Sequence, residues 1–143
     1  YGSFLLEQKR YPEAMEVFTR AAKDNLYQDR AGIFENLGLT ALKMNNRAQA
    51  KNYFERAIRS NIRQSKSLLE MSILMYEDKD YVQSKGYYES YLLVSEHDSR
   101  SLLLGSRLAS IYEDRNKAAS LGLQLKRLYP GSPEYQQYVL EQR

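Results

Sequence analysis

Apolar and small residues recur along the chain at spacings of three and four, which places them on one face of a helix. Polar, turn-forming residues separate these stretches at Asn45–Asn46, Asp78–Asp80 and Asp114–Asn116. The pattern predicts helices near residues 1–9, 12–24, 30–44, 48–60, 65–78, 82–96, 99–113 and 116–129. Pro130-Gly131 ends this series, and Ser132-Pro133-Glu134 begins a short final helix.

The pattern also repeats with a period of 34 residues. Positions of the second helix recur as Ala50, Phe54 and Ala57, then Ser84, Tyr88 and Tyr91, then Ala118, Gly122 and Leu125, and the earlier set Ala14, Phe18 and Ala21 lies 36 residues upstream. Positions of the first helix recur as Phe34, Leu37, Gly38 and Ala41, then Leu68, Met71, Ser72 and Met75, then Leu102, Gly105, Ser106 and Ala109. A period near 34 with an Ala-x-x-x-Phe-x-x-Ala core is typical of the tetratricopeptide repeat, in which each unit is a helix-turn-helix.

The expected fold is therefore all-α, a right-handed tetratricopeptide-repeat superhelix of antiparallel helix pairs with a C-terminal capping helix. We expect one solenoid over residues 1–143, made of a partial repeat 1–30, repeats 31–64, 65–98 and 99–132, and a capping helix 133–143. Small residues at Gly38, Ser72 and Ser106 and at Ala50, Ser84 and Ala118 allow paired helices to approach closely. Gly105 and Gly122 are likewise expected to be packing positions.

The N-terminus begins within the pattern rather than at the start of a repeat. Gly2 and Leu5 occupy the positions of Gly38 and Ala41, so residues 1–9 are expected to be the end of a first helix, with further repeats upstream. The 36-residue first spacing predicts a two-residue insertion around Asn25 to Asp29.

Composition excludes several classes of function. The 21 basic and 18 acidic residues are spread along the chain, and a net charge of +3 is too small to predict a nucleic-acid partner. The chain has no cysteine for a disulfide or a thiolate metal site, and no apolar run long enough to cross a bilayer. Arg56, Arg59, Arg63 and Lys66 form a basic run, interpreted as a solvated convex edge in preference to a site for an acidic partner.

The candidates for chemistry are few. His97, the only histidine, lies between Glu96 and Asp98 at an expected helix end, without converging partners for a base or a metal, and is interpreted as a solvated loop residue. The glycines form no phosphate-binding loop, and no serine lies in a nucleophile elbow. We therefore expect no catalytic, metal or cofactor site, no small-molecule substrate, and a protein that is not an enzyme.

The inner face of the solenoid is the candidate binding surface. First-helix residues that point away from their own second helix are expected to line it: Glu35, Leu39, Leu42, Leu69, Ile73, Tyr76, Leu103 and Arg107. Such an apolar strip suits an amphipathic helix or an extended apolar peptide of a protein partner. The alternative is that some of these residues contact a neighbouring repeat and belong to the core. The lining disfavours a clamp for a C-terminal carboxylate, which needs inward Lys, Arg or Asn side chains.

Several stretches resemble one family. They are Tyr1-Gly2-Ser3-Phe4-Leu5, Gln8-Lys9-Arg10-Tyr11, Phe34-Glu35-Asn36-Leu37-Gly38-Leu39, Tyr53-Phe54-Glu55, Ser101-Leu102-Leu103-Leu104-Gly105-Ser106-Arg107-Leu108-Ala109 and Leu123-Gln124-Leu125-Lys126-Arg127-Leu128-Tyr129-Pro130. Over nearly the whole chain they resemble the type IV pilus biogenesis lipoproteins called pilotins, the PilF/PilW family.

That resemblance implies a periplasmic protein held by an N-terminal lipid at the inner face of a bacterial outer membrane, where it helps the pilus secretin to localise and multimerise. It implies about six repeats, of which this chain would be the third to the sixth, and a membrane contact only through a lipid anchor that this chain lacks. No family binding residue carries over. Two alternatives remain open: a structural segment that supports a site in repeats further upstream, and a general adaptor for another periplasmic protein.

Overall fold

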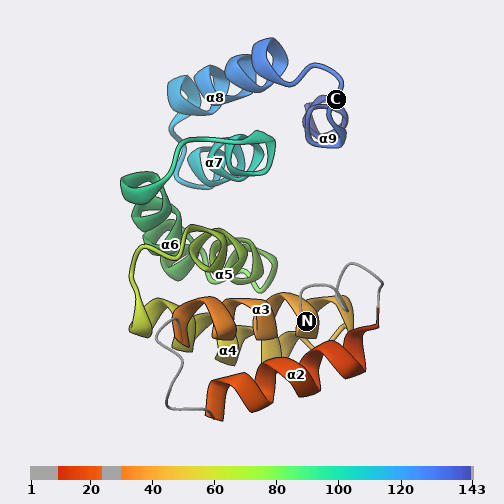
Figure 1. The fold of residues 1–143 in the computed structure, drawn as a ribbon. Coiled ribbons are helices and arrows are strands. Elements are labelled where there is room, and N and C mark those ends of the chain that lie inside the picture. Colours follow the sequence, from red (N-terminus) through yellow and green to blue (C-terminus); the bar gives the residue numbers. More distant parts are fainter. Residues whose placement is uncertain (1–9, 24–29, 143) are drawn as a thin grey trace. The chain divides into compact units, whose positions relative to one another are not determined.

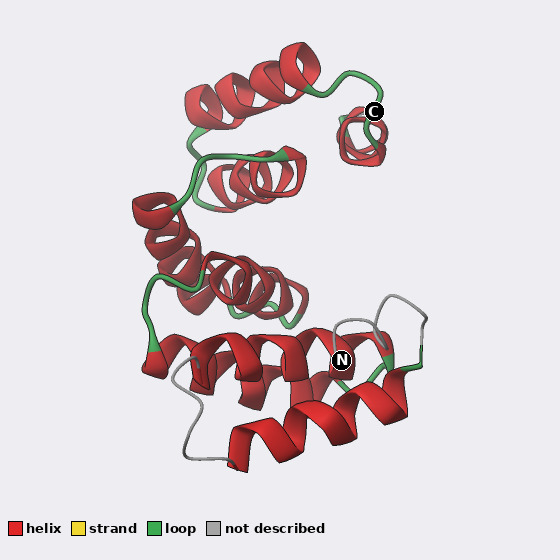
Figure 2. Cartoon of the chain, in the orientation of Figure 1, coloured by secondary structure: helices red, strands yellow, loops and turns green. Residues whose placement is uncertain are grey.

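The structure is a computed structural model that describes residues 10–23 and 30–142. These residues form helices joined by short loops, and no strand occurs among them (Figures 1 and 2). The helices are α2 (Tyr11–Lys23), α3 (Arg30–Lys43), α4 (Arg47–Ser60), α5 (Ser65–Glu77), α6 (Tyr81–Val94), α7 (Ser99–Ile111), α8 (Arg115–Leu128) and α9 (Pro133–Glu141). The predicted all-α fold is confirmed, and the predicted helix ends lie within two residues of these bounds. The expected helix at 1–9 and the expected insertion near Asn25 to Asp29 lie outside the described residues.

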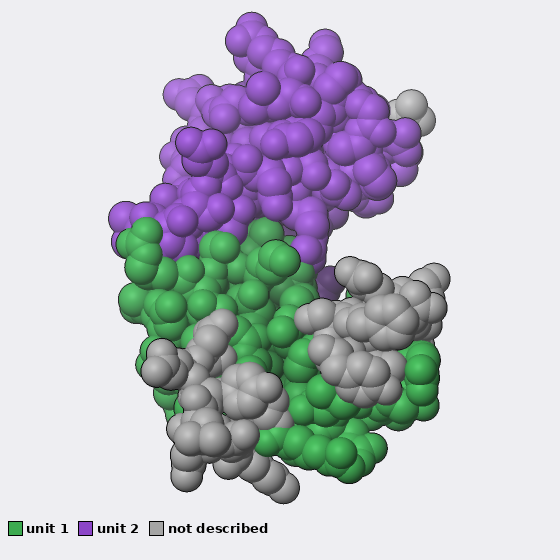
Figure 3. Space-filling view, viewed as in Figure 1, with its two compact units in different colours: residues 1–74 green, residues 75–143 purple. Residues whose placement is uncertain are grey.

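The chain divides into two compact units, Tyr1–Leu74 and Met75–Arg143, with the boundary inside α5 (Figure 3). In the first unit α3 packs against both α2 and α4. In the second unit α7 packs against α6 and α8, and α9 packs against α7 and α8. The division of the chain into the predicted repeats, and the hand of their superhelix, stay predictions.

Glycines and aromatic rings fix how closely paired helices approach. A Cβ built on Gly38 of α3 would lie 2.6 Å from two carbons of the fully buried Phe54 ring of α4. In the second unit a Cβ on Gly105 would meet the Tyr88 hydroxyl, and one on Gly122 would meet the ring of Tyr138. The predicted packing role of these three glycines is confirmed, because a larger side chain leaves no room for the neighbouring ring.

The turn between first and second helices has the same backbone geometry in each pair. Asn45, Lys79 and Glu113 have φ of 59°, 64° and 61°. The residue after each donates its backbone N–H to a carbonyl five residues earlier, at 2.9 Å for Asn46, 2.8 Å for Asp80 and 2.8 Å for Asp114. This is the Schellman arrangement at a helix C-terminus. The same Asn46, Asp80 and Asp114 cap α4, α6 and α8 through their side chains, so one turn ends one helix and starts the next.

Helix α9 closes the second unit. Ser132 caps it, and Pro133 occupies its first turn, where a missing N–H costs no hydrogen bond. Tyr135 and Tyr138 pack against a core of Leu102, Leu103, Leu121 and Leu125. The predicted capping helix is confirmed, since α9 covers apolar side chains of α7 and α8.

Candidate partner-binding surface

The eight residues predicted to line an inner groove have different environments. Leu39 and Leu42 of α3 and Ile73 and Tyr76 of α5 are half-buried, which leaves part of each side chain accessible. The other four are buried or bonded within the chain. The predicted groove is therefore reduced to the accessible parts of the four half-buried residues, and its role in binding stays a prediction.

Leu69 and Leu103 are core residues. Their side chains are 5% and 7% exposed. Leu103 packs with Leu121 and Leu125 in the cluster that α9 covers. The alternative left open from the sequence, that some of the strip belongs to the core, applies to both residues, because a buried leucine has no surface to offer a partner.

Glu35 of α3 caps the N-terminus of α5, the first helix of the following pair. Its Oε2 accepts hydrogen bonds from the Ser67 backbone N–H at 3.1 Å, the Ser67 hydroxyl at 2.9 Å and the Gln64 amide at 3.2 Å. Ser67 is the third residue of α5, where helical N–H groups lack a partner within the helix. In α7 the corresponding N–H, that of Ser101, donates to the Asp98 side chain. The residue equivalent to Asp98 before α5 is Gln64, which is not a carboxylate. Glu35 supplies that cap from a preceding helix and is a structural residue, contrary to the groove prediction.

Arg107 fastens α9 to α7. Its guanidinium donates two hydrogen bonds to the Glu141 carboxylate, one of them 3.0 Å long from Nε to Oε1. The guanidinium also lies 5.9 Å from the centroid of the Tyr76 ring. The hydrogen bond with Glu141 raises the pKa of Arg107, and the same bond lowers the pKa of Glu141. Arg107 is thus occupied by an intramolecular carboxylate rather than free for a partner.

His97 lies in the loop between α6 and α7, as expected, but its ring is not fully solvated. Its ring is half-buried, with Nδ1 2.9 Å from the Ser101 hydroxyl and Nε2 3.5 Å from the Tyr88 hydroxyl. Burial lowers the pKa of His97, which favours the neutral ring. The sequence-based interpretation was wrong because Ser101 and Tyr88 converge on the ring from α7 and α6. Both neighbours are hydroxyls in a packed corner, so the histidine has the environment of a structural residue.

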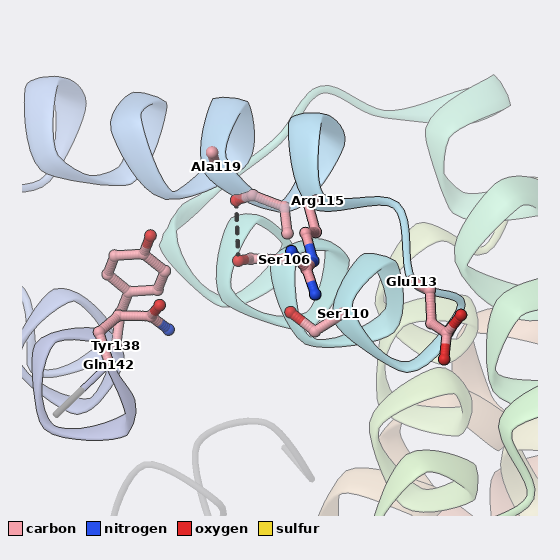
Figure 4. Close-up of a pocket in the computed structure, with 8 residues that line it drawn as sticks. Ser106, Ser110, Glu113, Arg115, Ala119, Tyr138 and Gln142 are labelled. Carbon is pink, nitrogen blue, oxygen red and sulfur yellow. Dashed lines mark hydrogen bonds between the residues drawn. The ribbon is translucent and has the colours of Figure 1, made fainter.

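A polar cavity that the sequence did not predict lies between α7, α8 and α9. Its volume is about 550 Å³, and it is lined by Ser106, Ser110, Glu113, Arg115, Ala118, Ala119, Tyr138 and Gln142 (Figure 4). Ser106 is already engaged, since its hydroxyl donates to the Ala118 carbonyl at 3.0 Å. The cavity is open and holds both an arginine and a glutamate, so it favours neither an anion nor a cation. Arg115 had been interpreted as a turn residue, and nothing in its local sequence signals a cavity.

One stretch of the chain matches a known repeat family. The Tetratricopeptide repeat family matches residues 31–61, which cover α3 and α4. The type IV pilus assembly protein PilF of Pseudomonas aeruginosa is 52% identical over 141 residues, which are 99% of this chain and 56% of PilF. The chain belongs with PilF among the tetratricopeptide-repeat proteins. The family resemblance drawn from the sequence is thereby confirmed, and the chain spans little more than half the length of this relative.

Solved structures agree with this placement. A structure of P. aeruginosa PilF has a TM-score of 0.94 at 52% identity and is covered over 64% of its length, while 99% of this chain is matched. The crystal structure of PilW has a TM-score of 0.77 at 23% identity, with 97% of this chain and 64% of that chain covered. At that identity PilW supports the fold alone.

Two further features bear on possible functions. No helix in residues 10–23 or 30–142 combines the length and apolar character needed to span a membrane. In the same part of the chain no three His, Cys, Asp or Glu side chains gather in a way that could hold a metal ion. The arrangement that the described residues do offer is a set of stacked helices with accessible side chains, which is the architecture of a binding scaffold.

Proposed function

We propose that this chain is a non-catalytic protein-binding scaffold that acts in type IV pilus assembly. The observation that carries the proposal is the 52% identity to PilF over 99% of the chain. The contacts that set the geometry, such as Gly38 against Phe54 and Arg107 against Glu141, stabilise helix packing, as a binding scaffold requires.

A chimera tests the role in pilus assembly. In P. aeruginosa PilF the 141 aligned residues are replaced by this chain, and the hybrid is expressed in a strain that lacks PilF. We expect twitching motility and surface pili to be restored. The control is a hybrid that carries a general tetratricopeptide array of the same length, because it preserves the fold and changes the surface. Equal rescue by both hybrids would reduce the role of this segment to that of a spacer.

The finer proposal is that the scaffold serves as a pilotin, at the inner face of the outer membrane and held there by an N-terminal lipid, with the pilus secretin as its partner. It rests on the family resemblance of the sequence stretches. The accessible parts of Leu39, Leu42 and Ile73 are the apolar anchors that would receive a segment of the secretin.

A pull-down with matched variants tests this partner. Leu39→Glu places a charge among the proposed anchors, whereas Leu93→Glu places the same charge on a side chain of α6 that is already 84% exposed. We expect wild type and Leu93→Glu to retain the secretin and Leu39→Glu to lose it, with circular dichroism confirming that each variant is folded. Retention by a folded Leu39→Glu protein would remove the groove from the proposal.

The alternative is that this segment supports a binding site elsewhere in a longer protein. It is favoured by the coverage, since 44% of PilF has no counterpart in this chain. On this alternative, full-length PilF and the chimera bind the secretin while the isolated chain does not. Binding by the isolated chain would reject it.

A further inference from the structure

A strongly basic surface lies on α4 and the loop that follows it. Residues 30–66 contain eight basic side chains, Arg30, Lys43, Arg47, Lys51, Arg56, Arg59, Arg63 and Lys66, and only two acidic ones, Glu35 and Glu55. The net charge of this stretch, eight basic against two acidic side chains, is therefore more positive than the net charge of the whole chain, which is +3. The sequence-based interpretation of charges spread along the chain was wrong for this segment.

Three of these basic side chains, those of Lys51, Arg56 and Arg59, line a shallow depression on the outward side of α4. The inward side of this helix is fixed by the fully buried Ala50, Phe54 and Ala57. On the other side Ala48, Lys51, Asn52, Glu55, Arg56 and Arg59 line a depression of about 420 Å³. The short side chains that line the depression are alanine and asparagine, and most of the long ones are cationic. The depression is therefore shallow and positively charged.

Several of these cations have no carboxylate partner within the described residues of the first unit. The guanidinium of Arg56 lies 5.8 Å from the centroid of the Phe34 ring, and no carboxylate among the described residues pairs with it. Arg59 pairs with Glu55, yet its side chain remains 72% exposed. The side chains of Arg63 and Lys66 also have no acidic partner among the described residues of the first unit, 10–23 and 30–74. An exposed pair contributes little to folding, so these cations remain available to an outside anion.

An aliphatic side chain projects beside these cations. Ile62 lies in the loop after α4, between Arg59 and Arg63, and is 67% exposed. The positions 34 and 68 residues later hold Glu96 and Pro130. The repeat therefore does not require an aliphatic residue at this position, and folding does not bury it.

We propose that the outward face of α4 and the loop at Ile62 bind the surface of an anionic phospholipid bilayer. The cations meet lipid phosphates in the headgroup layer, while Ile62 enters the boundary with the acyl chains, the arrangement of interfacial protein segments. A purely acidic polypeptide, such as poly-L-glutamate, would satisfy the arginines and leave Ile62 in water. Lipid is favoured because it accounts for the charge and for the aliphatic side chain together. This contact is independent of the role in pilus assembly.

Vesicle sedimentation of the 143-residue chain tests the proposal. The vesicles are phosphatidylcholine alone, or phosphatidylcholine mixed with phosphatidylglycerol, at low and at physiological salt. Each cation near an anionic surface contributes about fivefold to binding. We expect binding only to the mixed vesicles, weakened by salt, and lowered on the order of 20-fold by Arg59→Gln/Arg63→Gln.

The matched control is Lys126→Gln/Arg127→Gln, which removes the same net charge beside another exposed aliphatic residue, Leu128. We expect it to lower binding less than about threefold, because these charges lie on α8, outside the residues proposed to bind lipid. Ile62→Ser is expected to weaken binding several-fold even in high salt. Circular dichroism checks that each variant is folded.

Three results would overturn the proposal. The first is equal binding to both kinds of vesicle, and the second is an equal loss in the two double variants. The third is binding to poly-L-glutamate that depends on Arg59 and Arg63 without any binding to the mixed vesicles, which would identify the face as a site for acidic polypeptides.

Discussion

Two helical glycines provide a matched test of how α3 packs on α4. Gly38 is buried in α3, and a Cβ added there would lie 2.6 Å from two ring carbons of Phe54, whose side chain is fully buried. Gly86 lies within α6 and is exposed, and a Cβ added there would meet no atom within 4 Å. The same substitution, glycine to alanine, therefore changes packing at one site and not at the other.

The expected magnitudes follow from two contributions. Alanine in place of glycine within a helix stabilises it by about 1 kcal/mol, and both variants gain this. At Gly38 the added methyl group also overpacks the core, at a cost of about 1–3 kcal/mol. Gly86→Ala should therefore stabilise the protein by about 1 kcal/mol, and Gly38→Ala should range from about neutral to destabilising by about 2 kcal/mol. The difference between the two variants isolates the packing cost, because the helix contribution cancels.

Urea unfolding followed by circular dichroism measures this difference. With a slope of about 1–3 kcal/mol per molar urea, the two midpoints should differ by about 1 M, at equal slopes. Phe54→Leu adds a control, since a smaller side chain relieves the overlap and should cost less in the Gly38→Ala background than in the wild type. Equal midpoints for the two alanine variants, or an equal cost of Phe54→Leu in both backgrounds, would refute this account of the packing.

Three further changes probe the turns, the cap and a buried hydroxyl. Glu113→Gly should raise the midpoint of thermal unfolding, because Glu113 has φ of 61° and glycine adopts this left-handed conformation without strain. The relieved strain, about 1–2 kcal/mol, exceeds the cost of the entropy that glycine adds to the unfolded chain, about 0.4–1 kcal/mol. A lower midpoint would contradict the turn assignment. Glu141→Gln should loosen α9, seen as faster amide exchange there. Because the bond with Arg107 lowers the pKa of Glu141 in the folded state, the stability gap to the variant should be full above the ordinary pKa of 4.5 and close as pH falls through the lowered value; a gap that persists in acid would argue against the bond. Burial raises the pKa of Tyr88 from 10.0 to about 12, so its contribution is present below pH 10.0 and is lost as pH rises toward 12, and Tyr88→Phe should be less sensitive to alkali than wild type in pH-dependent unfolding.

The fold could be predicted because its determinants repeat at a fixed spacing. Ala50, Phe54 and Ala57 are fully buried, and the positions 34 residues on, Ser84, Tyr88 and Tyr91, are buried as well. Helical phase alone identifies such positions, since a face that recurs in every repeat must be the face that packs.

The turns show that position can determine backbone geometry more strongly than residue type. Asn45 is a residue that favours a positive φ, whereas Lys79 and Glu113 are not, yet all three adopt it. The backbone bonds of the Schellman arrangement and the caps that follow it hold each turn in place. Turn composition locates all three turns but signals the positive φ only at Asn45.

The candidate site could be predicted only in part, because phase gives the direction of a side chain and not what fills the space ahead of it. Leu69 and Leu103 belong to the predicted strip but are buried by neighbours. Glu35 and Arg107 are engaged by Ser67 and Glu141, residues that belong to the next helices in the array. The amphipathic pattern of a single helix does not predict hydrogen bonds to residues of other helices.

A signal for these bonds nevertheless exists at the repeat period. Glu35 bonds to Ser67, 32 residues on, Ser99 donates to Glu134, 35 residues on, and Arg107 bonds to Glu141, 34 residues on. Equivalent positions of neighbouring repeats lie close together in a stacked array, so a polar residue with a complementary group about one period away is a candidate for coupling between repeats.

This rule also decides which polar side chains remain for a partner. Arg59 has Leu93 about one period on and no carboxylate 32 to 35 residues on, in contrast to Arg107. Charges that couple repeats are satisfied once the fold forms. Charges that lack such a counterpart add nothing to the stacking of helices, and their accumulation on the outward side of α4 therefore calls for an explanation outside the folded chain.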